Sequence, residues 1–253
     1  MRILNALCIA FSTYSRIPTP RVEWTDENRR LVMCFFPLIG ACVGIALALW
    51  LALCDWLKLG VMLRGAVGTL IPLLITGGIH MDGFMDTCDA VASWQTRERR
   101  LEILKDSHVG AFAVMGCCGY LLADAALLSE ATLNDAPMLA CCFVISRALS
   151  AWLMTVLTSA RPGGMLDGFA RTAAVNRVMV SGVIYAGICI AVWIVCGGWL
   201  CAVLSVTAAL CVLGYRRMAY RQFGGVTGDL AGWFLQITEL CLTAAIIIGG
   251  KIL

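Results

Sequence analysis

The sequence has little charge. Only 14% of its 253 residues are Asp, Glu, Lys or Arg, whereas 60% are hydrophobic. Soluble globular proteins carry about 25% charged residues, so this composition excludes that class and is typical of a polytopic membrane protein. We expect an all-α membrane bundle that forms a single domain over residues 1–253. The net charge is only +3, and we expect no nucleic acid among the partners.

The sequence lacks any pair of cysteines in Cys-x-x-Cys spacing, although it contains 14 cysteines. Most of them lie inside apolar runs. This pattern argues against a zinc site and against a disulfide framework. We expect the cysteines to be small, reduced core residues.

The N-terminal stretch MRILNALCIAFSTYSRIP lacks a small-residue cleavage site. Its apolar run is short, and Asn5, Ser12 and Thr13 interrupt it. These features disfavour a secretory signal. We predict an N-terminal interfacial helix instead.

Seven apolar stretches are long enough, or nearly so, to cross a hydrocarbon core, which takes about 20 helical residues. They cover residues 33–54, 61–79, 109–128, 138–158, 178–197, 199–215 and 230–250. Only Gly197 and Gly198 separate the fifth from the sixth, so these two also fit a re-entrant hairpin. We predict about seven transmembrane helices, with the interfacial helix and a cytoplasmic amphipathic helix in addition.

The basic residues alternate between the two sides of these spans. Five lie in the N-terminal segment, four in the second loop, three in the fourth and three in the sixth. The opposite side has only Lys58, Arg64 and Lys251. The positive-inside rule therefore places the N-terminus in the cytoplasm and the C-terminus outside. We expect a multi-pass protein of the bacterial inner membrane whose active site faces the cytoplasm.

Three carboxylates follow the second span, in GGIHMDGFMDTCDAV. At about 100° per residue, a helix would place Asp82, Asp86 and Asp89 in one stripe about 60° wide. Like charges at this spacing repel one another, so a cation is expected beside them. Hard carboxylate oxygens without a cysteine or a ligand-spaced histidine pair suit Mg²⁺ or Mn²⁺. The alternative is a solvated helix face at the membrane boundary.

The next segment, TRERRLEILKDSHVG, is predicted to be an amphipathic cytoplasmic helix beside the acidic stripe. A surface helix that only supplies positive-inside charge would account for Arg97 and Arg99. Such a helix explains less well the polar cluster Lys105-Asp106-Ser107-His108, which lies directly before the third span. Lys105 and Ser107 of this cluster are candidates for substrate binding, and His108 is a candidate for catalysis.

Two further segments combine glycine with polar residues. SARPGGMLDGF places Arg161 at the end of the fourth span, and FGGVTGDLAG opens the seventh. Glycines allow backbone N–H groups to converge on an anion, and a helix N-terminus adds partial positive charge. No Gly-Lys-Ser/Thr follows, which excludes a Walker A loop; the alternative for each segment is an ordinary turn. The anion-binding candidates are Arg161, Gly224, Gly225, Thr227 and Gly228.

Arg147 lies inside the fourth predicted span. An intramembrane arginine is costly enough to indicate function. Asp124 is a conceivable partner, but its place in the preceding span is nearer the outer side. We therefore predict that Arg147 faces the cytoplasmic cavity and binds substrate. Acidic stripe, arginines and glycine-rich loops together favour phosphoryl or nucleotidyl-type transfer.

Six stretches are distributed along nearly the whole chain: SRIPTP, FFPLIGACVG, GGIHMDGFMDTCDA, RERRLEILKDSHVG, ARPGG and GGVTGD. In these stretches, their order and their approximate spacing, the chain resembles the cobalamin synthase family, the adenosylcobinamide-GDP ribazoletransferases. Two positions depart from the family pattern: Ala90 stands where Gly is usual, and Gln236 stands where an acidic residue is frequent, before Glu239. The departures affect secondary contacts, not the reaction.

The resemblance implies an Mg²⁺-dependent reaction between adenosylcobinamide-GDP and α-ribazole or its 5'-phosphate. A ribose hydroxyl would attack the cobinamide-side phosphate and release GMP, giving adenosylcobalamin or its 5'-phosphate. Membrane lipid and other corrinoid-assembly enzymes are the further expected partners. Asp82, Asp86 and Asp89 would hold the metal, with Asp229 and Glu239 as further candidates. His80 or His108 would act as base, or a metal-bound carboxylate such as Asp82 would serve instead.

Two other functions fit part of the pattern. CDP-alcohol-type membrane phosphotransferases also cluster aspartates around an Asp-Gly pair, but their longer signature fails in DGFMDTCDAV. Ion-coupled secondary transporters use intramembrane carboxylates, but they usually have internal repeats with charges near the bilayer midplane. This sequence has no convincing repeat, and its acidic residues gather at one boundary.

Overall fold

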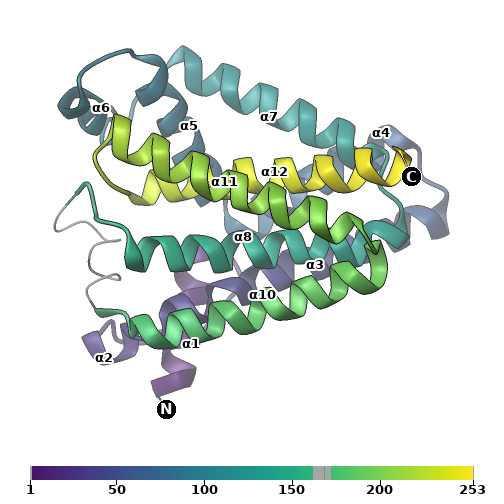
Figure 1. The fold of residues 1–253 in the computed structure, drawn as a ribbon, viewed down its shortest axis with the longest axis horizontal. Coiled ribbons are helices and arrows are strands. Elements are labelled where there is room, and N and C mark those ends of the chain that lie inside the picture. Colours follow the sequence, from purple (N-terminus) through teal and green to yellow (C-terminus); the bar gives the residue numbers. More distant parts are fainter. Residues whose placement is uncertain (1, 162–167, 169–171, 253) are drawn as a thin grey trace.

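The computed structural model describes residues 2–161, 168 and 172–252, and these residues form helices and connecting loops without a strand. The long helices lie side by side along the long axis of the molecule (Figure 1). In chain order the elements are α1 (Arg2–Tyr14), α2 (Asp26–Arg29), α3 (Val32–Leu57), α4 (Val61–Thr76), α5 (Ile79–Ala92), α6 (Arg97–Ile103), α7 (Ala111–Ser129), the 3₁₀ turn η1 (Leu133–Asp135), α8 (Ala136–Val156), α10 (Val175–Gly197), α11 (Leu200–Gln222) and α12 (Gly228–Ile252).

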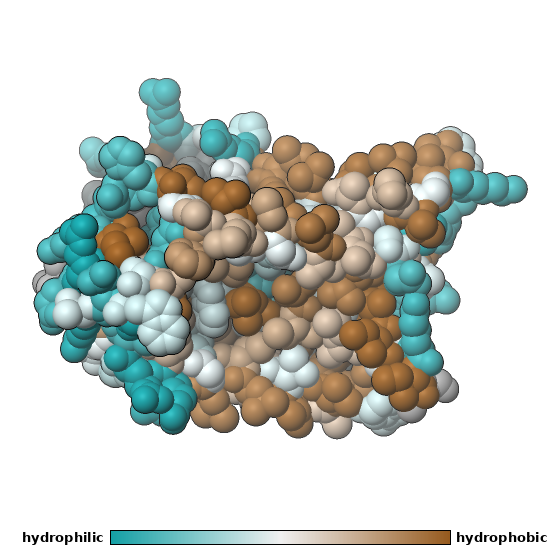
Figure 2. Space-filling model, turned by 90° about the horizontal axis from the view of Figure 1, so that it is seen from above, coloured by the Kyte–Doolittle hydropathy of each residue, from teal (hydrophilic) through white to brown (hydrophobic). Residues whose placement is uncertain are grey.

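Six of the described helices are long and apolar enough to cross a membrane, and the count becomes seven if α4 and α5 form one broken span. The predicted all-α polytopic membrane fold is therefore confirmed. α10 and α11 each have 23 residues and each could cross the membrane alone, which favours two spans over a re-entrant hairpin. Hydrophilic side chains gather at the two ends of the molecule, with more of them at the left end than at the right, and hydrophobic side chains cover most of the visible face between them (Figure 2).

The chain breaks between the second predicted span and the acidic stripe. Gly77 and Gly78 have φ values of +67° and +79°, a left-handed conformation that other residues rarely adopt. α4 ends before them, and α5 leaves at 99° to it. The acidic stripe therefore belongs to a separate short helix with its own direction.

The core of the bundle is built around α3 and α8. α3 carries Gly40 and Gly44, four residues apart, and a Cβ on Gly40 would lie 2.1 Å from the carbonyl oxygen of Phe143. At Gly44 a Cβ would lie 2.6 Å from the Cα of Ala140. Small residues at this spacing allow membrane helices to approach closely. The close α3–α8 contact fixes the side of α8 that carries Arg147.

The two predicted accessory helices are both present. α1 packs Ala6, Ile9 and Ala10 against the start of α3, as a helix with one apolar face should. The amphipathic helix expected over residues 96–110 is only seven residues long, as α6. It ends at Ile103, and the backbone N–H of His108 donates to the Asp106 side chain at 3.0 Å instead of continuing the helix.

Candidate functional site

A cavity of about 260 Å³ opens between α1, α3, α5, α8 and α12. Its lining includes side chains from five separate parts of the chain, so the packing of the bundle creates it. Six residues singled out from the sequence line this cavity: His80, Asp82, Arg161, Thr227, Gly228 and Asp229. The acidic helix, the arginine of one loop and the start of α12 therefore meet at one place.

Two glycines bring the acidic helix against α12. A Cβ on Gly83 would lie 2.8 Å from the Cα of Asp229, and a Cβ on Gly232 would lie 2.7 Å from the carbonyl oxygen of His80. Any larger side chain would force the helices apart. This crossing places Asp82 and Asp229, which are distant in sequence, on the same cavity wall.

The carboxylates form one electrostatic group. Asp82, Asp229 and Asp89 are all close enough to repel the charge of Asp86, and Arg161 is the cation that offsets them. Among the described residues, no three acidic, histidine or cysteine side chains converge closely enough to hold a metal ion by themselves. Mg²⁺ usually takes one or two carboxylates and completes its shell with water and substrate phosphates. The hard oxygens of Asp82, Asp86 and Asp229 suit that kind of site.

Arg161 is held beside Asp229 by a short pairing between two loops. The backbone N–H of Val226 donates to the carbonyl of Thr158, and the N–H of Ala160 donates to the carbonyl of Val226, both at 2.9 Å. One Nη atom of Arg161 donates to the Leu101 carbonyl at 3.0 Å, and the other lies 3.7 Å from Asp229 Oδ2. The guanidinium is therefore fixed at the cavity wall.

Gly224 and Gly225 do not line the cavity. Gly224 has a φ of +74°, and the Arg97 side chain covers it while donating from Nε to the Phe223 carbonyl at 2.7 Å. A Cβ on Gly225 would lie 2.4 Å from the Thr158 carbonyl oxygen. Packing explains both glycines, whereas Gly228 and Thr227 do border the cavity. Residues 162–167 and 169 of the SARPGGMLDGF segment lie outside the described residues.

His80 lies in the cavity wall, and its side chain is largely enclosed. The residue is 7% exposed, and its Nε2 atom has no hydrogen-bond partner among the described residues. Its ring packs against Phe36 with centroids 5.6 Å apart, and the Tyr14 ring, whose centroid is 4.6 Å from that of Phe36, lies 6.3 Å from the imidazole. A buried imidazole nitrogen beside a cavity is available to a bound ligand.

The polar cluster after α6 lies elsewhere. Lys105, Ser107 and His108 are all exposed, and none of them lines the cavity. The Nδ1 atom of His108 lies 2.6 Å from Asp106 Oδ1. Hydrogen bonds from the His108 side chain and backbone lower the pKa of the exposed Asp106 carboxyl. Of the two histidines, only His80 lines the cavity.

Asp89 has a local role at the start of α7. Its Oδ2 atom accepts a hydrogen bond from the Gly110 N–H at 2.6 Å, and its Oδ1 atom accepts one from the Ala113 N–H at 2.8 Å. A carboxylate at this position satisfies N–H groups that the helix leaves free and complements the helix dipole. The third carboxylate of the stripe therefore ties α5 to α7.

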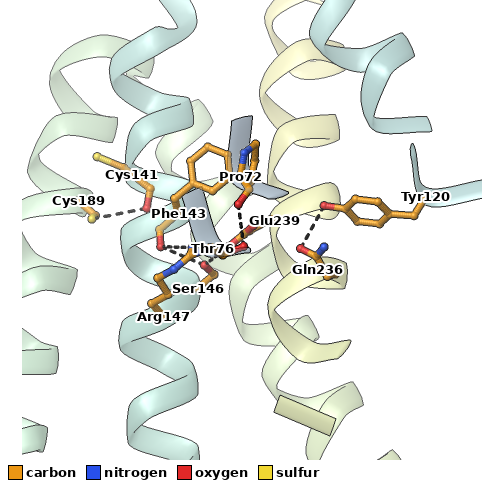
Figure 3. A network of polar contacts seen from close by, with 10 residues as sticks. All are labelled: Pro72, Thr76, Tyr120, Cys141, Phe143, Ser146, Arg147, Cys189, Gln236 and Glu239. Carbon is orange, nitrogen blue, oxygen red and sulfur yellow. Dashed lines mark hydrogen bonds and ion pairs between the residues drawn. The ribbon is translucent and has the colours of Figure 1, made fainter. Parts of the chain in front are cut away.

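Arg147 and Glu239 form a buried ion pair between α8 and α12 (Figure 3). The Nη1 atom of Arg147 donates to Glu239 Oε1 at 2.6 Å and to the Phe143 carbonyl at 3.0 Å. Ser146 donates to the same Glu239 oxygen at 2.7 Å. The arginine is 1% exposed and the glutamate 3% exposed, and neither lines the cavity. This geometry gives the two residues a shared structural role behind the site.

Sequence reasoning missed the apolar part of the cavity. Tyr14, Phe36, Met154 and Leu235 line it beside the polar residues. Their types are ordinary for a membrane bundle, so composition gives no signal. The motifs themselves held a clue, because Tyr14 immediately precedes SRIPTP and Phe36 lies within FFPLIGACVG.

Comparisons with known proteins agree along almost the whole chain. The family model described as cobalamin-5-phosphate synthase matches residues 6–247. The adenosylcobinamide-GDP ribazoletransferase of Lachnoclostridium phytofermentans is 44% identical over 248 residues, which are 98% of this chain and 95% of the relative. Its counterpart in Desulfitobacterium hafniense is 33% identical over 246 residues, which are 95% of each chain. No solved structure matches the chain. The chain belongs to the cobalamin-5-phosphate synthase family.

Proposed function

We propose that this protein is an adenosylcobinamide-GDP ribazoletransferase of the inner membrane, with its active site in the cavity that faces the cytoplasm. It joins α-ribazole, or its 5'-phosphate, to adenosylcobinamide-GDP and releases GMP. The observation that carries the proposal is the cavity itself, where Asp82, Asp229 and Arg161 meet in a chain that matches the family over residues 6–247. Carboxylates beside a fixed arginine suit a reaction that moves a phosphate group.

We assign Mg²⁺ binding to Asp82, Asp86 and Asp229. When bound, the ion would neutralise charge on the diphosphate oxygens of the substrate. Arg161 adds a second positive charge at the same wall, and its contacts with Leu101 and Asp229 orient it before substrate arrives. These residues position the diphosphate so that the bond between the cobinamide-side phosphorus and the bridging oxygen can break. GMP then leaves with that oxygen.

We assign the nucleoside acceptor to this cavity. A volume of about 260 Å³ suits a nucleoside, whereas a corrin macrocycle with its side chains is much larger. Tyr14 and Phe36 provide aromatic surface for a planar base. The Nε2 atom of His80 can accept a hydrogen bond from a ribose hydroxyl and withdraw its proton as that oxygen attacks phosphorus. The corrinoid therefore remains outside, and its diphosphate reaches in to Arg161.

The test measures GMP release by the purified protein in proteoliposomes. Adenosylcobinamide-GDP is added with α-ribazole or its 5'-phosphate, with and without Mg²⁺. Asp82→Asn, Asp86→Asn and Asp229→Asn should each lower turnover by orders of magnitude and raise the Mg²⁺ concentration that gives half-maximal rate, because each removes a charge that the ion needs. Glu98→Gln, at an exposed position of α6, is the matched control and should behave as wild type.

Failure to release GMP with either acceptor would refute the assigned reaction. Equal turnover with and without a chelator would refute the proposed requirement for Mg²⁺. His80→Gln should reduce the rate and remove the dependence on a base in the pH profile. An unchanged pH profile in that variant would transfer the role of base to a carboxylate.

A further inference from the structure

A second cavity, of about 490 Å³, lies at the beginning of α1, where α2 and the start of α10 meet it. It shares no lining residue with the candidate active site. The backbone N–H of Ala174 donates to the Arg30 carbonyl at 3.0 Å and holds the loop after α2 against the loop before α10. The residues that line it are Arg2, Ile3, Glu27, Arg30, Leu31, Ala174 and Arg177.

The charge of this cavity is strongly positive. Arg2 is paired with Glu27 at 3.1 Å, and Glu27 is the only acidic residue in the lining among the residues that the structure describes. Arg30 and Arg177 have no acidic partner within the described part of the chain. Two guanidinium groups from different segments therefore face one cavity without a neutralising charge. Arginine is well suited to bind phosphate oxygens, because its planar donors match their geometry.

The two helices α1 and α10 that meet at the cavity carry exposed apolar side chains close in sequence to its lining residues. Ile3 and Leu4 of α1 and Met179 and Val180 of α10 are all exposed. α10 is long and apolar enough to cross the membrane, and Arg177 lies in its first turn. The arginines therefore sit where the apolar surface of the bundle begins, at the level of lipid headgroups.

We propose that this cavity binds the headgroup of an anionic phospholipid. The phosphate would lie between Arg30 and Arg177, and the acyl chains would follow the exposed apolar side chains of α1 and α10. A soluble phosphate compound would use the arginines but would leave the apolar surface without a function. Basic pockets beside transmembrane helices are suited to anionic headgroups for the same physical reason.

The experiment measures binding of a pyrene-labelled phosphatidylglycerol to the whole purified protein in neutral detergent micelles. The wild type should prefer it to pyrene-labelled phosphatidylcholine. R30Q/R177Q should bind phosphatidylglycerol about 30-fold more weakly, since each arginine near an anionic surface contributes about a fivefold gain. R30K/R177K retains both charges and should bind within a few-fold of wild type. R216Q/R217Q, which removes two exposed charges from the end of α11, should leave binding unchanged.

Three results would overturn the proposal. One is equal affinity for the two lipids in the wild type. Another is an equal loss in R216Q/R217Q, which would show an effect of total charge and not of this cavity. The third is displacement of the labelled lipid by millimolar inorganic phosphate or GMP, which would assign the cavity to a soluble phosphate compound. Thermal unfolding of R30Q/R177Q at the wild-type temperature establishes that loss of binding is not loss of fold.

Discussion

The buried pair of Arg147 and Glu239 gives a prediction that separates a structural role from a role in the reaction. Arg147→Met removes the guanidinium but keeps much of the side-chain length. The Glu239 carboxylate is only 3% exposed, and among the described residues it then keeps only the Ser146 hydroxyl as a hydrogen-bond donor. The double variant Arg147→Met/Glu239→Gln removes both charges and keeps an amide that can still bind Ser146.

The burial and geometry of the pair determine how far each variant should lower the free energy of unfolding. Removing one partner of a buried ion pair costs about 3–5 kcal/mol, because an uncompensated charge stays inside the protein. Replacing both partners with uncharged groups is often close to neutral. For a chain of this length about 1 kcal/mol shifts the unfolding midpoint by about 2–4 °C. Arg147→Met should therefore unfold about 10 °C below wild type, and the double variant should recover most of that loss.

The assay uses the protein's own thiols. Cys141 and Cys142 lie on α8, one to two turns before Arg147, and both are buried. A thiol-reactive dye that fluoresces on reaction will report their exposure as the detergent-solubilised protein is heated. A variant that unfolds earlier becomes fluorescent at a lower temperature.

Two outcomes would contradict the structural role. If the double variant is as unstable as Arg147→Met, the two charges do not stabilise each other. If the folded double variant needs at least tenfold more Mg²⁺ for half-maximal GMP release, Glu239 is a metal ligand, as the sequence first suggested. Recovered stability with an unchanged Mg²⁺ requirement supports the pair as a structural element.

Three other predictions follow from the helix contacts and the distribution of charge. Asp89→Asn should lower the free energy of unfolding by about 1–2 kcal/mol through weaker capping of α7 without changing the Mg²⁺ requirement, measured by thermal unfolding and GMP release; a raised requirement would make it a ligand. Gly232→Val should separate α5 from α12 and abolish GMP release, whereas Gly187→Ala, in open space on α10, should not; an active valine variant would contradict the crossing. Reporter fusions after Lys105 should read cytoplasmic and those after Asp135 external; the reverse would invert the topology.

The fold was largely predictable because the features that determine it can be read from the order of residues along the chain. Apolar length marks each span. The break at Gly77 and Gly78 was not predicted, since two glycines can continue a helix or end it. Only the packing of the N-terminal segment against this point decides between them, and the Arg16 N–H donating to the Ile75 carbonyl at 2.7 Å is part of that packing.

The site was predictable only in part, because a sequence lists chemical groups without their directions. His80, Asp82 and Arg161 line one cavity, whereas His108 follows a short turn that leaves it exposed. From the sequence alone, the two histidines are equally plausible as the base. Their difference arises from where α6 ends.

The glycine-rich loop illustrates the same limit. A nest for an anion and a close approach to another backbone both require glycine, and the sequence does not distinguish them. Gly225 lies against the Thr158 carbonyl, so at this position the close approach is the reason for glycine. The contact depends on a loop more than sixty residues earlier, which no local pattern reveals.

The position of Glu239 on α12 has a consequence for the biosynthesis of the protein. The ribosome makes α8, with Arg147, well before it makes α12, so the arginine enters the membrane before its counter-charge exists. Asp82 on α5 is likewise made before α12, the helix that completes the cavity wall beside it. A nascent chain that has reached only α11 therefore carries an unmatched intramembrane cation, which is costly in the bilayer. α12 thus closes the membrane assembly and the active site in one late event.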